Sequence, residues 1–189
     1  MWLTGRPEAD ELLADSDNAL LIGMVLDQQI PMEKAFSGPA VIAERMGGRF
    51  DVAAIADTEV DDFVELCSRK PAIHRFPGSM GKRVHQVAQA LVEDYDGDAG
   101  NIWRGVDDAA TVLERLRNLP GLGEQKAKIF LALLGKQRDV RPSGWQAAAG
   151  DYGKAGHRSV ADVTDEASLQ QVRAHKKEQK RAAKAAASD

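Results

Sequence analysis

The chain has 189 residues, of which 43% are hydrophobic, 5% aromatic and 29% charged, and its formal net charge is −4. It contains no apolar run of the roughly 18 residues that a membrane span needs. A single cysteine, Cys67, excludes an intrachain disulfide and a four-cysteine metal or iron–sulfur site. We therefore expect a cytoplasmic protein without a membrane partner, a metal or another cofactor. The scarcity of aromatic and β-branched residues favours a helical core.

Charge is divided unevenly along the chain. Residues 1–66 carry 4 Lys/Arg against 14 Asp/Glu, whereas residues 67–189 carry 21 against 15. The first part is thus net negative by 10 and the second net positive by 6. Because phosphate contacts require a local basic face and not a basic whole chain, this asymmetry permits a DNA partner.

The first strong helix begins after Ser16 or Asp17, and its residues 19–26 are apolar on nearly every side. A helix without a polar face is one surrounded by others. It ends at the polar Asp27-Gln28-Gln29, before a proline that forbids continuation. Periodicity and capping residues predict further helices at about 32–46, 58–66, 80–95, 108–118, 124–135 and 145–149. The fold class is therefore all-α.

The C-terminal part is irregular at residues 136–163 and polar beyond them. Asp165 is expected to cap a helix that passes into a tail, where residues 173–184 hold six positive charges and one negative. The tail is either a solvated, fraying helix or a nonspecific phosphate contact. We expect one helical domain at residues 1–163, followed by a polar helix and basic tail at 164–189.

A Pro-Gly-x-Gly turn joins the helices that end near Asn118 and begin at about Glu124. Glycine permits positive φ and leaves no Cβ in the way. Backbone N–H groups at such a turn and at the following helix N-terminus can converge on one anion, and phosphate is the natural guest. The alternative is that the turn is only a connector between two packed helices.

Two stretches together resemble the helix-hairpin-helix (HhH-GPD) DNA glycosylases of base-excision repair. The first is Leu119-Pro120-Gly121-Leu122-Gly123, and the second is the apolar helix that ends in Gln28-Gln29. The resemblance covers roughly residues 19–145, and the chain is also similar to an actinobacterial-type subgroup with the same lysine-rich end. It implies a helical glycosylase-like fold and double-stranded DNA as the partner.

By this resemblance, Gly121, Leu122 and Gly123 supply N–H donors that hold phosphates beside a lesion, with Lys126 as an auxiliary cation. Such contacts position the strand without reading its sequence. The nucleotide is rotated out of the duplex into a pocket, because a base inside the stack cannot be reached.

The resemblance also places Gln28 and Gln29 where the family inserts residues into the gap left by the extruded base. Capping of the helix end and solvent contact are the alternative. Lys82 and Arg83 close the basic loop that begins at Pro71, and the family's equivalent loop contacts the DNA backbone. A merely solvated loop is the alternative there.

The sequence departs from the family pattern at two positions. Bifunctional members carry a lysine nucleophile two residues after the second hairpin glycine, and here that position is Gln125. Lys126 is one step further on, which turns a helical side chain by about 100°, so strand cleavage by Schiff-base chemistry is not expected. The family's aspartate window reads Ser143-Gly144-Trp145 and holds no carboxylate.

Other residues are candidates for the missing chemistry. Asp139 and Asp151 flank the aspartate window, and either becomes the catalytic carboxylate if the loop path differs; a solvated loop carboxylate is the alternative for both. Trp145 and Tyr152 are candidates to stack on an extruded base, with ordinary packing as the alternative. Asp27, beside the glutamine pair, is a further carboxylate near the expected pocket, or only a polar residue at a helix end.

The sequence therefore predicts a monomeric, nucleoid-associated DNA repair protein. The leading interpretation is a monofunctional DNA N-glycosylase that releases damaged or modified bases by hydrolysis. One alternative is a catalytically inactive DNA-binding or lesion-sensing module that lost its aspartate. A further alternative is a helical interaction protein.

Overall fold

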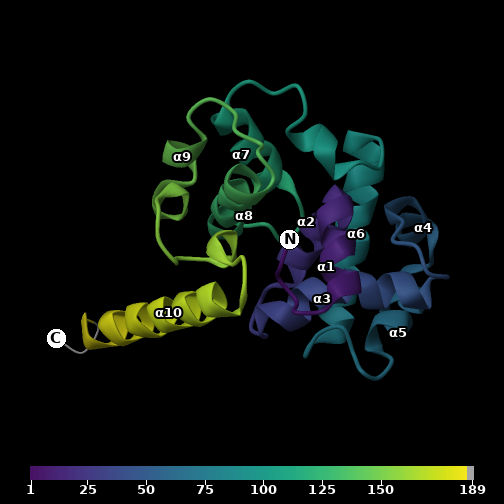
Figure 1. The fold of residues 1–189 in the computed structure, drawn as a ribbon. Helices are drawn as coiled ribbons and strands as arrows, with labels where there is room; N and C mark the ends of the chain where they lie inside the picture. The colour runs from purple at the N-terminus through teal and green to yellow at the C-terminus, as the bar shows by residue number, and fades with distance from the viewer. Residues whose placement is uncertain (187–189) are drawn as a thin grey trace.

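The computed structural model describes residues 1–186 of the chain, and Figure 1 shows their arrangement. The α-helices are α1 Pro7–Asp15, α2 Asp17–Leu26, α3 Met32–Arg45, α4 Val52–Asp57, α5 Val60–Ser68, α6 Pro77–Tyr95, α7 Ala109–Asn118, α8 Glu124–Gln137, α9 Trp145–Ala148 and α10 Glu166–Ala186. Short 3-10 helices are η1 Ala99–Ile102, η2 Gly150–Gly153 and η3 Val160–Asp162. The all-α prediction is confirmed. None of the described helices is both long and apolar enough to cross a membrane.

Helix α2 lies at the centre of the fold. The Ser16 hydroxyl accepts a hydrogen bond from the backbone N–H of Ala19 at 3.1 Å and so caps the helix. Every residue from 19 to 26 is buried, because α1, α3, α6 and α8 all pack against α2 (Figure 1). The polar turn that follows Leu26 is thereby fixed in position relative to the helices that surround α2.

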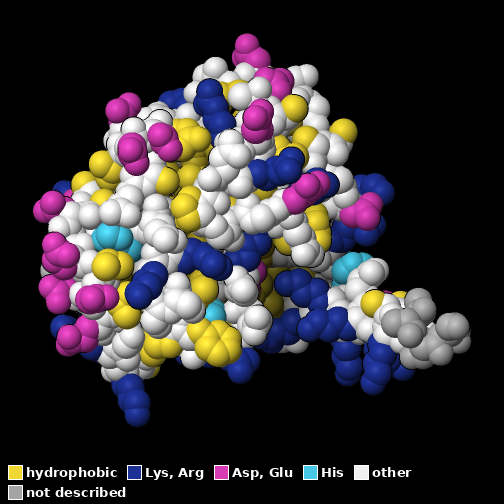
Figure 2. Space-filling model, turned by 180° about the vertical axis from the view of Figure 1, so that it is seen from behind, with side chains coloured by type: hydrophobic (Ala, Val, Ile, Leu, Met, Phe, Trp, Pro, Cys, Tyr) yellow, Lys and Arg dark blue, Asp and Glu magenta, His cyan; other side chains and the backbone are white. Residues whose placement is uncertain are grey.

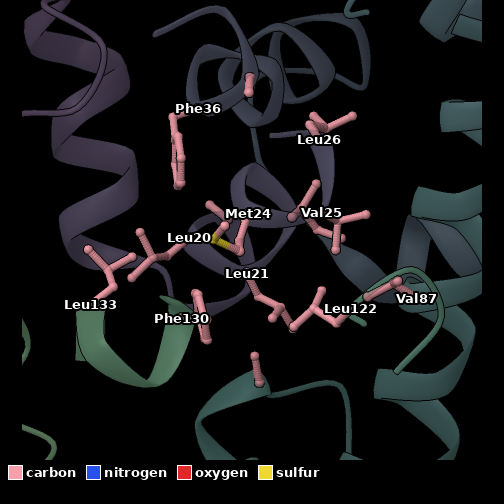
Figure 3. Packing of buried hydrophobic residues seen from close by; sticks show 14 of the residues in the cluster. Leu20, Leu21, Met24, Val25, Leu26, Phe36, Val87, Leu122, Phe130 and Leu133 are labelled. Carbon is pink, nitrogen blue, oxygen red and sulfur yellow. The ribbon is translucent and has the colours of Figure 1, made fainter. Parts of the chain in front are cut away.

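The turn between α7 and α8 is anchored in the same core. Figure 3 shows the side chain of Leu122 pointing into the apolar cluster between Leu21 and Val87. Leu122 is only 1% exposed, and full burial of a leucine is worth about 1.5–3 kcal/mol. The hairpin and the central helix are therefore tied together through one shared hydrophobic contact region.

Two elements differ from the prediction. Helix α6 begins at Pro77 and not near Met80, since proline at the first helical position is already set for helical φ. Lys82 and Arg83 therefore lie on a helix, and their placement in a loop was wrong. Helix α1 was not predicted, because few apolar positions mark it within an acidic stretch.

Helix α10 is anchored at its first turns only. Leu169 and Val172 are buried, and Arg173 forms a 2.5 Å ion pair with Glu33 of α3. Beyond this point α10 projects away from the body (Figure 1). The helix continues through the basic stretch to Ala186, and most residues of that stretch are exposed. The domain division at residue 163 stays a prediction.

Candidate nucleic-acid site

The turn between α7 and α8 has the geometry that Pro-Gly-x-Gly predicts. Gly121 lies at φ +79°, a left-handed conformation that favours glycine. A Cβ added there would also stand 2.2 Å from Cδ of Arg83, whose side chain crosses the turn. The backbone N–H of Leu122 donates to the carbonyl of Leu119 at 3.2 Å. The backbone therefore favours glycine at this position, and any larger residue would also displace the side chain of Arg83.

Residues 123–125, at the start of α8, are exposed. Among the described residues no side chain caps α8, so the N–H groups of its first turn are available to an anion. Glu124 in that turn is paired with Lys128 at 2.7 Å and Arg117 at 3.6 Å, which offsets its negative charge. The N–H of Leu122, predicted as a donor to phosphate, is used inside the turn, so Leu122 serves as the anchor.

Lys82 and Arg83 precede the hairpin in sequence and were predicted to contact DNA. In the structure, Arg83 lies at the hairpin itself. Its half-buried side chain lies against Gly121, so its positive charge lies beside the proposed phosphate position. Lys82 is exposed on the same helix turn. Helix α6 thus contributes basic side chains beside the hairpin.

The turn after α2 presents Gln29 in an unusual backbone conformation. Its φ is +57°, and its side chain is exposed. The left-handed region costs a non-glycine residue about 1–2 kcal/mol. Backbone strain that persists at an exposed polar residue is typical of a functional position.

A buried histidine braces this turn. The ring Nδ1 of His74 accepts from the N–H of Phe76 at 3.0 Å, so Nε2 carries the hydrogen and donates to the carbonyl of Gln28 at 2.8 Å. Burial lowers the pKa of His74 and favours this neutral ring. His74 belongs to the loop that begins at Pro71, but it is 1% exposed and holds the backbone of Gln28 in place.

Changing Gln29 to glycine is expected to weaken binding to a duplex containing an abasic site about tenfold, because one amide contact is lost. Stability should hardly change, since relief of the positive φ offsets the extra backbone entropy of glycine, each about 1 kcal/mol. Fluorescence anisotropy and thermal unfolding measure the two effects. Gln89→Ala, on an exposed position of α6, is the control and should bind as wild type. Equal affinities of both variants would contradict the insertion role.

A cleft of about 1130 Å³ opens between the α2 turn, the start of α8, η2 and α10. Its volume lies just above the range for small-molecule sites, about 300–1,000 Å³. Figure 2 shows Lys and Arg side chains on both sides of the hollow between the body and the projecting helix. Of the residues singled out from the sequence, the cleft brings together Asp27, Gln28, Gln29, Gln125, Lys126, Asp151 and Tyr152.

Lys126 and Asp27 form a pair of opposite charge in this cleft. The ammonium of Lys126 donates to the carbonyl of Val25 at 2.8 Å, which satisfies the C-terminal end of α2. Burial lowers the pKa of Lys126 to about 8. Burial likewise raises the pKa of Asp27, while the positive charges of Lys176 and Lys126 oppose that rise. Lys126 therefore faces the cleft.

The structure does not bring Asp139 to the cleft. Its side chain is 84% exposed and pairs with Arg141 at 3.2 Å. The aspartate window is also held elsewhere, because Ser143 exchanges backbone hydrogen bonds with Asp107 and Ala109 at 2.7 and 3.0 Å. Asp139, one of the two carboxylates that flank the family position in sequence, is thus outside the cleft lining.

Trp145 likewise lies outside the cleft lining. Its ring packs so closely over Gly135 that an added Cβ there would stand 2.5 Å from the ring. This geometry corresponds to ordinary packing, the alternative given for Trp145. Asp151 does line the cleft, but it is 72% exposed and its pairing with Lys154 at 2.6 Å lowers its pKa.

Tyr152 reaches the cleft together with two side chains that can hydrogen-bond. The amide Nε2 of Gln125 donates to the Tyr152 hydroxyl at 2.9 Å. Arg158 also lines the cleft, and its Nε is buried without a hydrogen-bond partner among the described residues. Nothing in the local sequence marked Arg158, since it is a lone cation in an irregular stretch.

A helix-hairpin-helix turn, with no side-chain cap at the start of α8 among the described residues, therefore lies next to a cleft lined by glutamines and cations. The family model for HhH-GPD superfamily base excision DNA repair proteins matches residues 22–189. The chain belongs to this superfamily. No curated protein and no solved structure matches the chain significantly.

Proposed function

We propose that the protein is a monofunctional DNA N-glycosylase in which Asp27 supplies the carboxylate that the family places elsewhere. The observation that carries this proposal is the position of Asp27. It lies in the cleft beside Gln28 and Gln29, under the positive charges of Lys126 and Lys176. Double-stranded DNA is the partner, bound by a monomer, which places the protein at the nucleoid in the cytoplasm.

The chemistry follows from the charge of Asp27. Cleavage of an N-glycosidic bond builds positive charge on the sugar, and a desolvated carboxylate beside it stabilises that charge or removes a proton from the attacking water. Water adds to C1′, its proton passes to the carboxylate, and the bond to the base breaks with its electron pair leaving on the base. Lys126 helps to keep Asp27 ionised for this role.

The extruded base is held by Tyr152, Gln125 and Arg158. The aromatic face of Tyr152 suits stacking, which is worth about 1–3 kcal/mol per base. The guanidinium of Arg158 offers a donor without a partner, and the Gln125 amide can donate or accept. These groups favour a base with exposed carbonyl acceptors.

Hydrolysis without strand cleavage is proposed because Gln125 occupies the position of the lysine nucleophile. Lys126 is bound to the Val25 carbonyl and, with a pKa of about 8, remains largely protonated at neutral pH. Borohydride added during the reaction should therefore trap no covalent adduct with DNA. An adduct that disappears in Lys126→Met would contradict the monofunctional assignment.

Base release from duplex oligonucleotides tests the proposal. Single damaged bases (uracil, hypoxanthine, alkyl-purines and 8-oxoguanine) are incubated with excess protein, and abasic sites are revealed by hot alkali. Release of at least one base is expected. If every base is retained although the protein binds abasic duplex, the enzyme assignment fails and the lesion-sensing alternative takes its place.

A further inference from the structure

The cations of α10 lie on one face of the helix. They occupy positions 173, 176, 177, 180, 181 and 184, a spacing of three and four residues that places them along one stripe. The stripe continues the face on which Leu169 and Val172 are buried against the body. The sequence thus replaces apolar residues by lysine and arginine where the helix leaves the protein. We call this row the α10 stripe.

The α10 stripe borders the cleft described above. Lys176 and Lys180, with His175 and Gln179 beside them, line it opposite the start of α8. Figure 2 shows Lys and Arg side chains gathered at the base of the projecting helix, across the hollow from other Lys and Arg side chains of the body. A strand that is seated on the hairpin with a nucleotide in the cleft would therefore pass along α10.

The α10 stripe carries an electrostatic cost in the free protein. Four pairs of like charge stand four residues apart (173 and 177, 176 and 180, 177 and 181, 180 and 184), and such pairs destabilise a helix. Within the same stretch Glu178 is the one acidic residue. A polyanion that lies along the stripe would relieve this repulsion, because it places negative charge beside each cation.

The base of α10 is fixed well enough to serve as a wall. Asp165 caps it, with the N–H of Ser168 donating to the Asp165 carboxylate at 2.7 Å. The Arg173–Glu33 ion pair and the buried Leu169 and Val172 join it to α3 and the body. The helix has 21 residues, a length of about 30 Å, so the stripe can follow several successive phosphates of one strand.

We propose that α10 is a second phosphate-binding wall, which holds the DNA backbone on the side of the cleft opposite the hairpin. This inference rests on the proposed function, because it requires that DNA occupies the cleft. The contacts are to phosphates and carry no base specificity. The helix thereby adds affinity for duplex DNA and narrows the path of the strand beside the extruded nucleotide.

The test compares two double variants of the full chain. Lys176→Ala/Lys180→Ala removes two cations that face the cleft, and alanine keeps the helix propensity. Arg49→Ala/Arg104→Ala removes the same charge from exposed positions outside the cleft. Dissociation constants for an abasic-site duplex are measured from 50 to 200 mM salt, with far-ultraviolet circular dichroism to check helicity.

The slope of log K against log salt should fall by about 1.8 in the α10 variant, since each phosphate contact contributes about 0.9. The control should keep the wild-type slope. A slope unchanged in both variants, or lowered equally in both, would overturn the inference. Lost binding to anionic phospholipid vesicles with unchanged binding to duplex would overturn it in favour of a membrane surface.

These outcomes are distinct from failure of the proposed function. If wild-type protein does not bind duplex DNA at 50 mM salt, both the function and the α10 wall are refuted. If the wild-type protein binds duplex DNA and the Gly123→Pro variant does not, the hairpin is supported as a phosphate site. An unchanged salt slope in the Lys176→Ala/Lys180→Ala variant would then refute only the role of α10.

Discussion

Replacing Asp27 with asparagine should lower the single-turnover rate of base release about 100- to 1,000-fold, the usual effect of removing one preorganised charge-stabilising group. Asparagine has nearly the same shape but carries no negative charge to stabilise the sugar cation. Binding to a duplex with an abasic-site analogue should stay within about twofold of wild type, because phosphate contacts carry that affinity. The measurement uses the first base found to be released by the wild-type protein.

The same variant should be at least as stable as wild type at pH 7. Burial raises the folded-state pKa of Asp27 above its ordinary value of 3.8. The folded chain then binds more protons than the unfolded chain between these two values, so ionised Asp27 reduces stability at higher pH. Asparagine removes that cost. A lower melting temperature for Asp27→Asn would show that the carboxylate has a structural role.

Asp151→Asn and Asp139→Asn are the matched controls. Asp151 lines the cleft but is exposed and paired with Lys154, and Asp139 lies outside the lining. Both should release base at the wild-type rate. A large loss of base release in either variant, with Asp27→Asn still active, would show that the carboxylate changed in that variant is the catalytic one.

The pH profile offers an independent check on Asp27. Its raised pKa places the acid limb of the rate profile above the ordinary value of 3.8. Lys176 lowers that pKa by its positive charge, and Glu33 raises it. Lys176→Met should therefore shift the acid limb of the rate profile to higher pH. An unshifted acid limb would show that it does not report the ionisation of Asp27.

Replacing Gly123 with proline should weaken binding to duplex DNA about 10- to 100-fold. The variant removes one N–H donor at the start of α8, and a hydrogen bond to a charged group is worth about 1.5–3 kcal/mol. The fold should persist, because Gly123 already has φ −58°, close to the value that proline fixes. Anisotropy titration and circular dichroism measure the two properties.

Gly123→Ala is the matched control for this experiment. A Cβ at Gly123 would meet no atom within 4 Å, and its φ suits any residue. Alanine keeps the N–H donor and should bind DNA as wild type. Equal binding by the proline variant, with helicity intact, would refute the assignment of the hairpin as a phosphate site.

The helices and the hairpin were predictable because their signals are local. Asp165 was expected to cap its helix, and Ser16 was one of two residues expected at the start of α2; each accepts a backbone hydrogen bond as a cap does. The end of α2 and the Pro-Gly-x-Gly turn are likewise marked by proline and glycine within a few residues. Such features need no knowledge of distant parts of the chain.

The cleft could not be read in the same way, because its residues meet only through the tertiary fold. Val25 and Lys126 are joined by a hydrogen bond across 101 positions. Without that contact, the position of Lys126 in the sequence suggested a side chain turned away from the pocket. Lys126 lies one residue after the position of the family's lysine, and this offset predicted the direction of its side chain relative to the axis of α8. It did not predict that the C-terminal end of α2 lies within reach of that side chain.

The candidate carboxylates were chosen by their distance along the chain. Asp139 and Asp151 were chosen because they flank the family position, whereas Asp27 is more than 90 residues before the hairpin. Trp145 was chosen as an aromatic residue in an irregular region, yet Gly135 offers its ring a flat packing surface. Periodicity does not report which loop residues face a cavity.

The central claim is that a nucleotide leaves the duplex and enters the cleft beside Asp27, Gln29 and Lys126. The most direct measurement compares the affinity of the wild-type protein for a duplex with one abasic-site analogue and for the same duplex undamaged, at one salt concentration. Extrusion costs a few kcal/mol less where no base pair must be broken. We expect at least about tenfold tighter binding to the abasic duplex. Equal affinity for the two duplexes would contradict the account.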